Sequence, residues 1–432
     1  MTIDAGRPVI SRGARTIAIN TAAMAAGPLG AAALAPVLAR VLGPEGRGQM
    51  AAVLAPLTFA DAIATIGVPA AIAFYRARGT GSTRLVQLAL PLLALSGALS
   101  YAALFWFAPV VSDQHGLDVT VVRVLWTAVI AGIFLAVLRA CRQGESAWGR
   151  LNLEAVLGPV LRLVACSGVL LTGSGSAQLV TAVYLASGTV VGLVLLRRRP
   201  VAVSAVPAPD PTRRELVGYG ARSWATGLSS VVNARIDQLF LAVVLPAGAL
   251  GLYAVSVTVA ELPGILYRAA APVLFTRVAG GYGWAASARV VRLVTWSSLT
   301  MGAAVALVAR PLVELVFGES FGDAAVTVQI LVVGGVLAAG STSLASVLAG
   351  QGRPGVVSLT EAGGVLVTLV GMVLAVPTWG AVGAAVTVSG TQAVVWSVRA
   401  VAFVRFSGLG AGSLVVLRRA DVAAVVPSWR AR

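Results

Sequence analysis

The sequence predicts an all-α polytopic membrane protein with 12 transmembrane helices, arranged as two six-helix lobes with both termini in the cytoplasm. The composition is the first of three observations that predict this class: of the 432 residues, 58% are hydrophobic and only 11% are charged, whereas soluble domains carry about 25% charged residues. The other two are the recurrence of long apolar stretches and the placement of basic residues in alternate loops. Such a small number of charges cannot cover a water-exposed surface. A soluble globular protein is therefore excluded.

The apolar stretches are each long enough to cross the hydrocarbon core as a helix, which takes about 20 residues. The first stretch is too long for a signal peptide and is expected to remain as a span. The twelve expected spans lie near residues 16–42, 50–74, 85–108, 119–140, 153–172, 177–196, 216–245, 249–276, 290–310, 324–349, 356–376 and 380–404.

Arginine placement sets the orientation. All 32 basic residues are Arg, and most of them gather at the amino terminus, in the even-numbered loops and in the tail. The third and ninth loops carry Asp and Glu instead. Basic short loops stay in the cytoplasm, so the net charge of +16 indicates topology and not nucleic-acid binding.

Missing residue types exclude several chemistries. Without Lys the chain has neither the phosphate-binding residue of a P-loop ATPase nor the amine of a Schiff-base enzyme. One histidine, His115, is expected to be solvated in a loop, and the two cysteines suggest no disulfide framework. We therefore expect no cofactor, no metal site and no enzyme activity.

A weak internal repeat divides the chain into halves. Gly13–Thr16 matches Gly220–Ser223, and Glu154-Ala155 matches Glu361-Ala362, both at an offset of about 207 residues. Six spans separate the copies, so both halves enter the membrane in the same direction, as in parallel-repeat transporters whose substrate sites lie where the repeats meet. The expected domains are lobes 1–196 and 216–405, a Pro-rich cytoplasmic linker 197–215 and a basic cytoplasmic tail 406–432.

Four segments resemble a known family. LARVLGPEGRGQM (Leu38–Met50) is similar to the first-span signature of polysaccharide and O-antigen exporters, and RIDQLFLAVVLPAGALGLYAVS (Arg235–Ser256) resembles their seventh-span signature. The segments Gln351–Arg353 and Thr378–Val386 resemble their tenth loop and twelfth span. These exporters, the Wzx-like flippases, share a superfamily with multidrug exporters of the MATE type and the lipid II flippase.

The resemblance implies a function at the bacterial plasma membrane. It implies a multi-pass flippase that moves a polyprenyl-diphosphate-linked oligosaccharide between leaflets by alternating access, for surface polysaccharide biosynthesis. The implied partners are this lipid-linked substrate, the bilayer, a coupling ion (H⁺ or Na⁺) and glycan polymerase machinery. A MATE-like exporter of small cationic or amphipathic molecules and a lipid II-type flippase are the alternatives. A membrane enzyme would need a long outer loop with catalytic groups, which the sequence lacks.

Ionisable residues inside the spans are the strongest indication of a site, since each costs roughly 2.5–3.5 kcal/mol at the bilayer centre. On the seventh span a polar stripe runs through Arg222, Ser230, Asn233 and Asp237 within an arc of about 80°. We interpret it as the wall of a wet cavity, although such a stripe also glues helices together. The substrate-binding candidates are Arg162, Arg222, Ser230, Asn233, Arg235 and Arg268.

Carboxylates in the spans are the candidates for coupling to a cation, because a carboxylate in the membrane can titrate or bind Na⁺. They are Asp61, Asp237 and Glu261. Two further acids, Glu154 and Glu361, begin matching helices, where a negative charge is favourable at a helix amino terminus.

Overall fold

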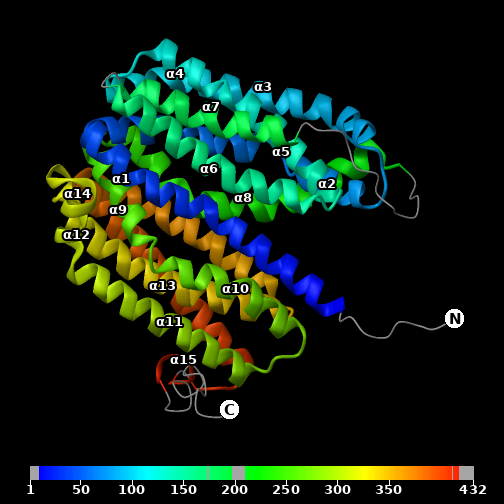
Figure 1. The fold of residues 1–432 in the computed structure, drawn as a ribbon. Helices are drawn as coiled ribbons and strands as arrows, with labels where there is room; N and C mark the ends of the chain where they lie inside the picture. The colour runs from blue at the N-terminus through cyan, green and yellow to red at the C-terminus, as the bar shows by residue number, and fades with distance from the viewer. Residues whose placement is uncertain (1–8, 173–174, 197–209, 411, 418–432) are drawn as a thin grey trace. The chain divides into compact units, whose positions relative to one another are not determined.

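The computed structural model describes residues 9–172, 175–196, 210–410 and 412–417. Throughout this part the chain is helical, with no β-strand (Figure 1). The elements are α1 (Val9–Ala64), α2 (Val68–Ala77), α3 (Ser82–His115), α4 (Val119–Trp126), α5 (Ala128–Gly144), α6 (Trp148–Leu171), α7 (Ala177–Leu196), α8 (Arg213–Val244), α9 (Ala247–Ala260), α10 (Gly264–Ala279), α11 (Trp284–Leu307), α12 (Ala309–Phe317), η1 (Glu319–Phe321), α13 (Ala324–Gly350), α14 (Pro354–Ser407) and α15 (Gly412–Val415).

Several helices in the described part of the chain have the length and the apolar composition needed to cross a membrane. Eight helices are long and apolar enough to cross a bilayer: Ala26–Ala64, Ser82–His115, Val119–Gly144, Trp148–Val169, Ala177–Leu196, Trp284–Leu307, Ala324–Gly350 and Pro354–Ser407. The predicted all-helical membrane class is therefore confirmed. The count of twelve spans stays a prediction.

Two of the longest helices turn sharply at a glycine. Within α1 the backbone leaves helical geometry at Gly43, with φ 66° and ψ −178°. Within α14 it does so at Gly380, with φ 54° and ψ −131°. Only glycine reaches such conformations readily. Each kink falls close to the border between two predicted spans, so Gly43 and Gly380 act as corners between successive helical segments.

The chain divides into two compact units. Unit 1 comprises Met1–Leu42 and Val53–Leu228, and unit 2 comprises Gly43–Ala52 and Ser229–Arg432. The chain therefore passes from one unit to the other within α1 and again within α8. The predicted lobes stay a prediction, and residues 197–209 of the predicted linker and 418–432 of the predicted tail lie outside the described residues.

Unit 1 is built from closely packed helix pairs. In it α6 packs along α7, α2 packs against α5, and α3 contacts α4 and α5 (Figure 1). Trp126 at the end of α4 is fully buried, and its indole N–H donates to the Val53 carbonyl at 2.9 Å. A buried tryptophan needs such a partner for its polar edge. This bond ties α4 to α1.

The end of α3 corrects one expectation. His115 is only 3% exposed, so the prediction of a solvated histidine is wrong. Next to it Asp118 caps α4, its carboxylate accepting the backbone N–H groups of Thr120 and Val121 at 2.7 and 3.1 Å. These bonds hold the pKa of the Asp118 carboxyl below its usual value. The cap is therefore complete at neutral pH and weakens only as the pH falls through that lowered pKa.

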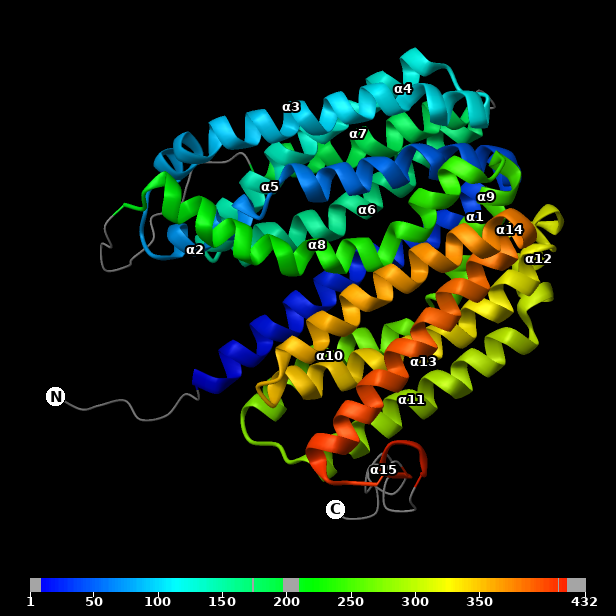
Figure 2. The ribbon, with the colours of Figure 1, turned by 180° about the vertical axis from the view of Figure 1, so that it is seen from behind.

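Unit 2 is organised around α13. This helix contacts α9, α10, α11, α12 and α14, and most of its side chains are buried (Figure 2). Hydroxyl groups join the helices, as where the Ser389 hydroxyl of α14 donates to the Ile330 carbonyl of α13 at 2.8 Å. In a bilayer, where burial of apolar surface between helices gains little, such close packing and hydroxyl bonding holds a bundle together.

The last described residues fold back onto unit 2. We call residues 412–417 the C-terminal clip. Its Leu414 is 4% exposed and joins a core cluster with Leu274, Val291 and Phe403 from three different helices. Arg292 donates to the Ser413 carbonyl, and the Trp296 indole donates to the Val415 carbonyl at 2.8 Å. The clip thus fastens the end of α14 to α11.

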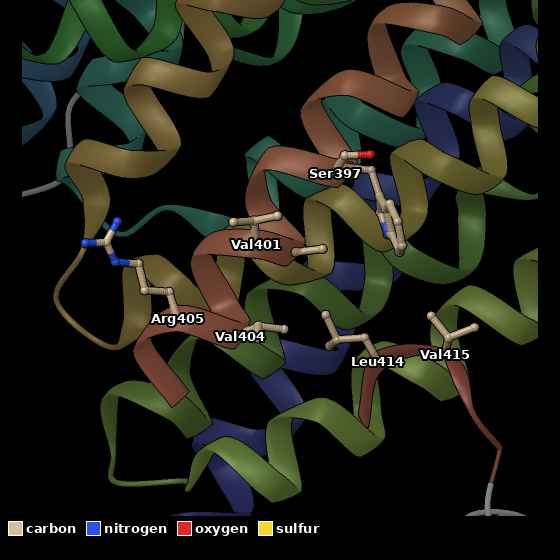
Figure 3. A pocket seen from close by; sticks show the side chains of 8 residues that line it. Ser397, Val401, Val404, Arg405, Leu414 and Val415 are labelled. Carbon is tan, nitrogen blue, oxygen red and sulfur yellow. The ribbon is translucent and has the colours of Figure 1, made fainter. Parts of the chain in front are cut away.

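A small apolar pocket lies beside the clip. It has a volume of about 400 Å³ and opens between α14 and the clip, with Arg405 at its rim (Figure 3). Val401 and Val404 form one wall, and Leu414 and Val415 form the other. The pocket holds none of the predicted site residues.

Candidate functional site

A break in the helical backbone marks the site in unit 1. The sequence predicts one continuous stretch over 50–74, but α1 ends at Ala64 and α2 begins only at Val68. The turn between them carries positive φ at Ile66 (42°) and Gly67 (65°). Pro69 occupies the first turn of α2, where its missing N–H is tolerated. The helix is therefore interrupted inside a predicted membrane span.

Two carbonyl groups next to this break accept hydrogen bonds from other helices. The Trp224 indole of α8 donates to the Ala62 carbonyl at 2.9 Å, and the Ser96 hydroxyl of α3 donates to the Ala64 carbonyl at 2.6 Å. Backbone meets backbone at the turn itself, since a Cβ added to Gly67 would lie 2.1 Å from the Gly220 oxygen. The interruption is thus held by two neighbouring helices, which satisfies the polar groups that lipid cannot.

Asp61 lies one turn before the break. Its Oδ1 is buried and has no hydrogen-bond partner among the described residues. Gly132 of α5 makes room for this oxygen, because a Cβ there would lie 2.7 Å from it. Arg139 attracts the carboxylate from a distance. Asp61 is therefore a carboxylate in the membrane helices with an oxygen left to bind a proton or a cation.

Unit 2 has a matching interruption in the eighth predicted span. There α9 ends at Ala260 and α10 begins at Gly264, so the predicted stretch over 249–276 is not one helix. Glu261 caps the end of α9, with its N–H donating to the Val257 carbonyl at 3.0 Å. This residue is partly buried. The second and the eighth predicted spans therefore each combine a broken helix with an acidic residue, an arrangement that occurs at binding sites of transporters.

A buried acid contacts α9 about two helical turns before that break. Asp237 of α8 is 8% exposed, and its Oδ2 accepts the Tyr253 hydroxyl of α9 at 2.6 Å. Tyr253 is fully buried. The second oxygen, Oδ1, is buried without a hydrogen-bond partner in the described part. Arg235 also attracts this carboxylate from a distance. Because the direct donor, Tyr253, is neutral and a buried carboxylate charge needs more compensation than that, this pair also suits a proton or a cation.

Arg162 is the best defined of the predicted phosphate-binding residues. It lies in α6, where its Nε donates to the Tyr184 carbonyl of α7 at 3.2 Å and its guanidinium lies 4.0 Å from the centre of the Tyr184 ring. Gly188 leaves space for the end of the side chain, since a Cβ there would lie 2.5 Å from Nη2. No described carboxylate neutralises Arg162. Its two terminal nitrogens therefore keep their hydrogen-bond donors available.

The remaining predicted residues are placed as follows. Arg222 is exposed on α8, and Arg235 is partly buried farther along the same helix. Neither forms an ion pair within 4 Å with a described residue. The side chains of Ser230, Asn233 and Arg268 lie outside the described part. Arg162 and Arg222 belong to unit 1, and Arg235 belongs to unit 2.

Sequence reasoning missed a set of buried ion pairs. Glu145, whose side chain is fully buried, accepts Arg76 at 3.1 Å through Oε1 and Arg142 at 2.6 Å through Oε2. Two further pairs involve the acids expected to act only on helix amino termini: Glu154 pairs with Arg139, and Glu361 pairs with Arg399. In the sequence these arginines served only to predict the topology. In the structure their ion pairs also join helices. The only available signal was the Arg142–Glu145 spacing of one helical turn.

Metal binding receives no support from these groups. Among the described residues no cluster of three or more His, Cys, Asp or Glu side chains has a geometry that could hold a metal ion. The acids at the two breaks occur singly and suit a proton or a monovalent ion.

Family comparison decides the class of protein. Residues 37–326, more than half of the chain, match the family model described as "Polysaccharide biosynthesis protein". The chain belongs to the polysaccharide biosynthesis protein family. The predicted resemblance is therefore confirmed. No curated protein matches the sequence.

Solved structures similar to this member of the family define its fold. An inward-facing MATE multidrug resistance transporter of the MOP superfamily matches with a TM-score of 0.71 at 16% identity, covering 89% of this chain and 98% of its own. The lipid II flippase MurJ matches with a TM-score of 0.71 at 8% identity, covering 92% and 90%. An outward-facing MATE transporter matches at 0.60 and 19% identity, covering 91% and 95%.

Family and fold together define the class of protein. This polysaccharide biosynthesis family member shares its fold with MATE transporters and with the lipid II flippase MurJ. It also carries several helices of membrane-crossing length and is a multi-pass membrane protein.

Proposed function

We propose that this protein flips a polyprenyl-diphosphate-linked oligosaccharide across the bacterial plasma membrane for surface polysaccharide biosynthesis. The observation that carries the proposal is Arg162, a guanidinium in a membrane helix with its terminal nitrogens unpaired by any described carboxylate. The match to a polysaccharide biosynthesis family supports the glycan part of the substrate.

Arginine suits a diphosphate for physical reasons. The guanidinium stays charged and presents a planar fork of donors that fits phosphate oxygens. An unpaired charge in the membrane costs several kcal/mol, and an anionic headgroup would offset that cost during transport. In this proposal Arg222 captures the headgroup, and Arg162, Arg235 or Arg268 receives it deeper in the membrane. Ser230 and Asn233 line the same path.

The proposed topology follows from the loops. Twelve spans form two six-helix lobes related as parallel repeats, with both termini in the cytoplasm, and transport proceeds by alternating access. The broken helices at Thr65–Gly67 and Glu261–Pro263 support this part, because interrupted helices absorb conformational change more easily than continuous ones.

Coupling to H⁺ or Na⁺ is assigned to three acids in this proposal. Asp61 and Asp237 each have one buried oxygen without a described hydrogen-bond partner, and Glu261 lies at the second break. A proton or Na⁺ bound at these oxygens would favour one conformation over the other. Glycan polymerase machinery would take up the product in the outer leaflet.

Two alternatives share the fold. A lipid II-type flippase is the second candidate, because a solved structure that carries that name matches as well as any transporter described above. A MATE-like exporter of small cationic or amphipathic molecules is less well supported, because a cavity for cations should contain acids without Arg162 and Arg222.

A reconstitution assay tests the proposal and separates the alternatives. Purified protein in liposomes receives a fluorescent diphosphate-linked oligosaccharide, lipid II or a cationic dye, and a membrane-impermeant reagent reports which leaflet holds each substrate. We expect rapid exposure of the oligosaccharide lipid and much slower movement of the other two. Equal rates for protein-free liposomes, or movement of the dye alone, would overturn the proposal.

A further inference from the structure

We propose that a groove between α3 and α5 binds one anionic phospholipid of the surrounding bilayer. The groove has a volume of about 690 Å³, within the range of about 300–1,000 Å³ of small-molecule sites. It belongs entirely to unit 1. Its occupant is a lipid of the membrane and not the transported substrate, so this proposal does not depend on the proposed function.

The groove has an apolar end and a polar end. Both helices line it over about 15 residues, from Ser82 to Ala98 on α3 and from Glu145 back to Ile130 on α5. At 1.5 Å per residue this is a length of about 22–24 Å, longer than one leaflet of a core about 30 Å thick. At the apolar end the helices approach closely, since a Cβ on Gly97 would lie 2.8 Å from Ile133. One acyl chain therefore fits along the groove and ends there.

The polar end carries a positive field. Arg142 and Glu145 line it, and both side chains are at least nine-tenths buried. Glu145 is shared by Arg142 and Arg76, so two guanidinium groups face one carboxylate. Both carboxylate oxygens are used as acceptors, so within the described part of the chain two guanidinium groups share the charge of this one carboxylate. An anionic headgroup complements these two guanidinium groups.

The start of α3 adds hydrogen-bond donors at the same end. Ser82 and Thr83 line the groove in the first turn of α3, and the preceding Gly81 provides no side-chain cap for that turn. Unpaired N–H groups and the positive end of the helix dipole favour an anion there. A phosphodiester at this place would accept from the serine and threonine hydroxyls as well.

The surface around the groove selects a lipid over a soluble anion or a protein helix. Both walls belong to helices of membrane-crossing length and composition. Leu90, Ile130 and Phe134 line the groove and are each more than half exposed, and such side chains at this depth meet lipid chains. The polar end lies beside the Arg-rich second and fourth loops, which are predicted to be cytoplasmic. An inner-leaflet anionic phospholipid has the required geometry.

A groove-filling variant tests the apolar part. Full-length protein is purified in detergent with dioleoylphosphatidylglycerol or dioleoylphosphatidylcholine, and bound lipid is counted by native mass spectrometry. Ala94→Trp fills the groove, whereas Ala102→Trp places the same side chain on an exposed part of α3 outside it. We expect Ala94→Trp to bind phosphatidylglycerol about tenfold more weakly than wild type, and Ala102→Trp to bind it normally.

A charge variant tests the polar part independently. Gln87→Glu adds a negative charge in the groove, and Gln143→Glu adds one at the same end of α5 but outside it. We expect Gln87→Glu to weaken phosphatidylglycerol binding about fivefold, the factor expected for one charge at an anionic lipid surface, with phosphatidylcholine and the Gln143→Glu protein unaffected. This variant decides the question if Ala94→Trp fails to fold.

Three results would overturn the proposal. The first is equal phosphatidylglycerol binding by wild type and Ala94→Trp. The second is an equal preference of wild type for the two headgroups. The third is stoichiometric displacement of phosphatidylglycerol by a polyprenyl phosphate, which would make the groove part of the substrate path.

Discussion

Arginine has two different roles in this protein, and the partner of each side chain separates them. Arg76, Arg142 and Arg399 are buried and paired with Glu145 or Glu361. Arg162 lies against an aromatic ring and a carbonyl oxygen. A buried pair is costly to break, because the remaining charge is left without compensation. Arg162 forms no ion pair with a described carboxylate and is therefore the residue suited to bind an incoming anion.

Loss of the shared carboxylate should destabilise unit 1. Glu145→Gln leaves the buried Arg76 and Arg142 without their shared negative charge, at a cost of about 3–5 kcal/mol. The matched control is Glu314→Gln, which breaks the exposed Arg310–Glu314 pair and should change the stability far less, because exposed ion pairs contribute little. Unfolding of both proteins in detergent micelles measures the difference. Equal stability of the two variants would show that the Glu145 cluster is not a structural element.

The position of Arg162 can be changed without removing it. In Gly188→Ala the new Cβ meets the flexible end of the Arg162 side chain at 2.5 Å, so the guanidinium must move. We expect stability to change by less than about 1 kcal/mol and transport to fall about tenfold or more, because misplacement of a binding group is costly. Gly168→Ala on α6, where a Cβ meets no atom within 4 Å, is the control. Normal transport by Gly188→Ala would argue against a role for Arg162 in binding.

At the scale of elements, the interruption between α1 and α2 is the feature that sequence reasoning did not provide. A Gly and a Pro in an apolar stretch signal a break, but Gly67 and Pro69 lie among many other glycines and prolines in this chain. The donors that make the break tolerable, Trp224 and Ser96, come from distant parts of the sequence. Tertiary contacts therefore decide which Gly-Pro pair interrupts a helix.

The break should be sensitive to any side chain at its centre. Gly67→Ala incurs about 1–2 kcal/mol for a positive φ and about 1–3 kcal/mol for overpacking against Gly220. Gly116→Ala, also at positive φ but with no atom within 4 Å of the new Cβ, should incur only the first cost. Thermal unfolding in detergent compares them. If Gly116→Ala is as unstable as Gly67→Ala, the close approach of the two backbones contributes nothing.

The C-terminal clip is the second element with a measurable role. Leu414→Ala removes a buried side chain from a cluster shared with α10, α11, α13 and α14 and should cost about 2–5 kcal/mol. Leu417→Ala, three residues away and 39% exposed, should have little effect. Unfolding in detergent and proteolysis of the end of α14 report the change. A stable, protease-resistant Leu414→Ala protein would mean that the clip does not fasten unit 2.

For the whole molecule, the sequence predicted the class better than the contacts. Low charge and long apolar stretches depend on composition alone, so the membrane class and the transporter family could be predicted. Asp61, Arg162 and Asp237 could be selected because an ionisable residue in an apolar stretch is conspicuous. Their neighbours Gly132, Tyr184 and Tyr253 could not be selected. Nothing in the sequence distinguishes them from other residues of their type, and only the folded structure shows that they contact a charged side chain.

The central claim is that guanidinium groups in membrane helices hold the diphosphate, and transport by Arg variants tests it most directly. In the liposome assay with a diphosphate-linked oligosaccharide, Arg162→Ala and Arg222→Ala should each lose most of the transport rate. Arg214→Ala, which removes an exposed charge from the first turn of α8, should retain it. Full transport by both Arg162→Ala and Arg222→Ala, at normal protein levels, would contradict the account.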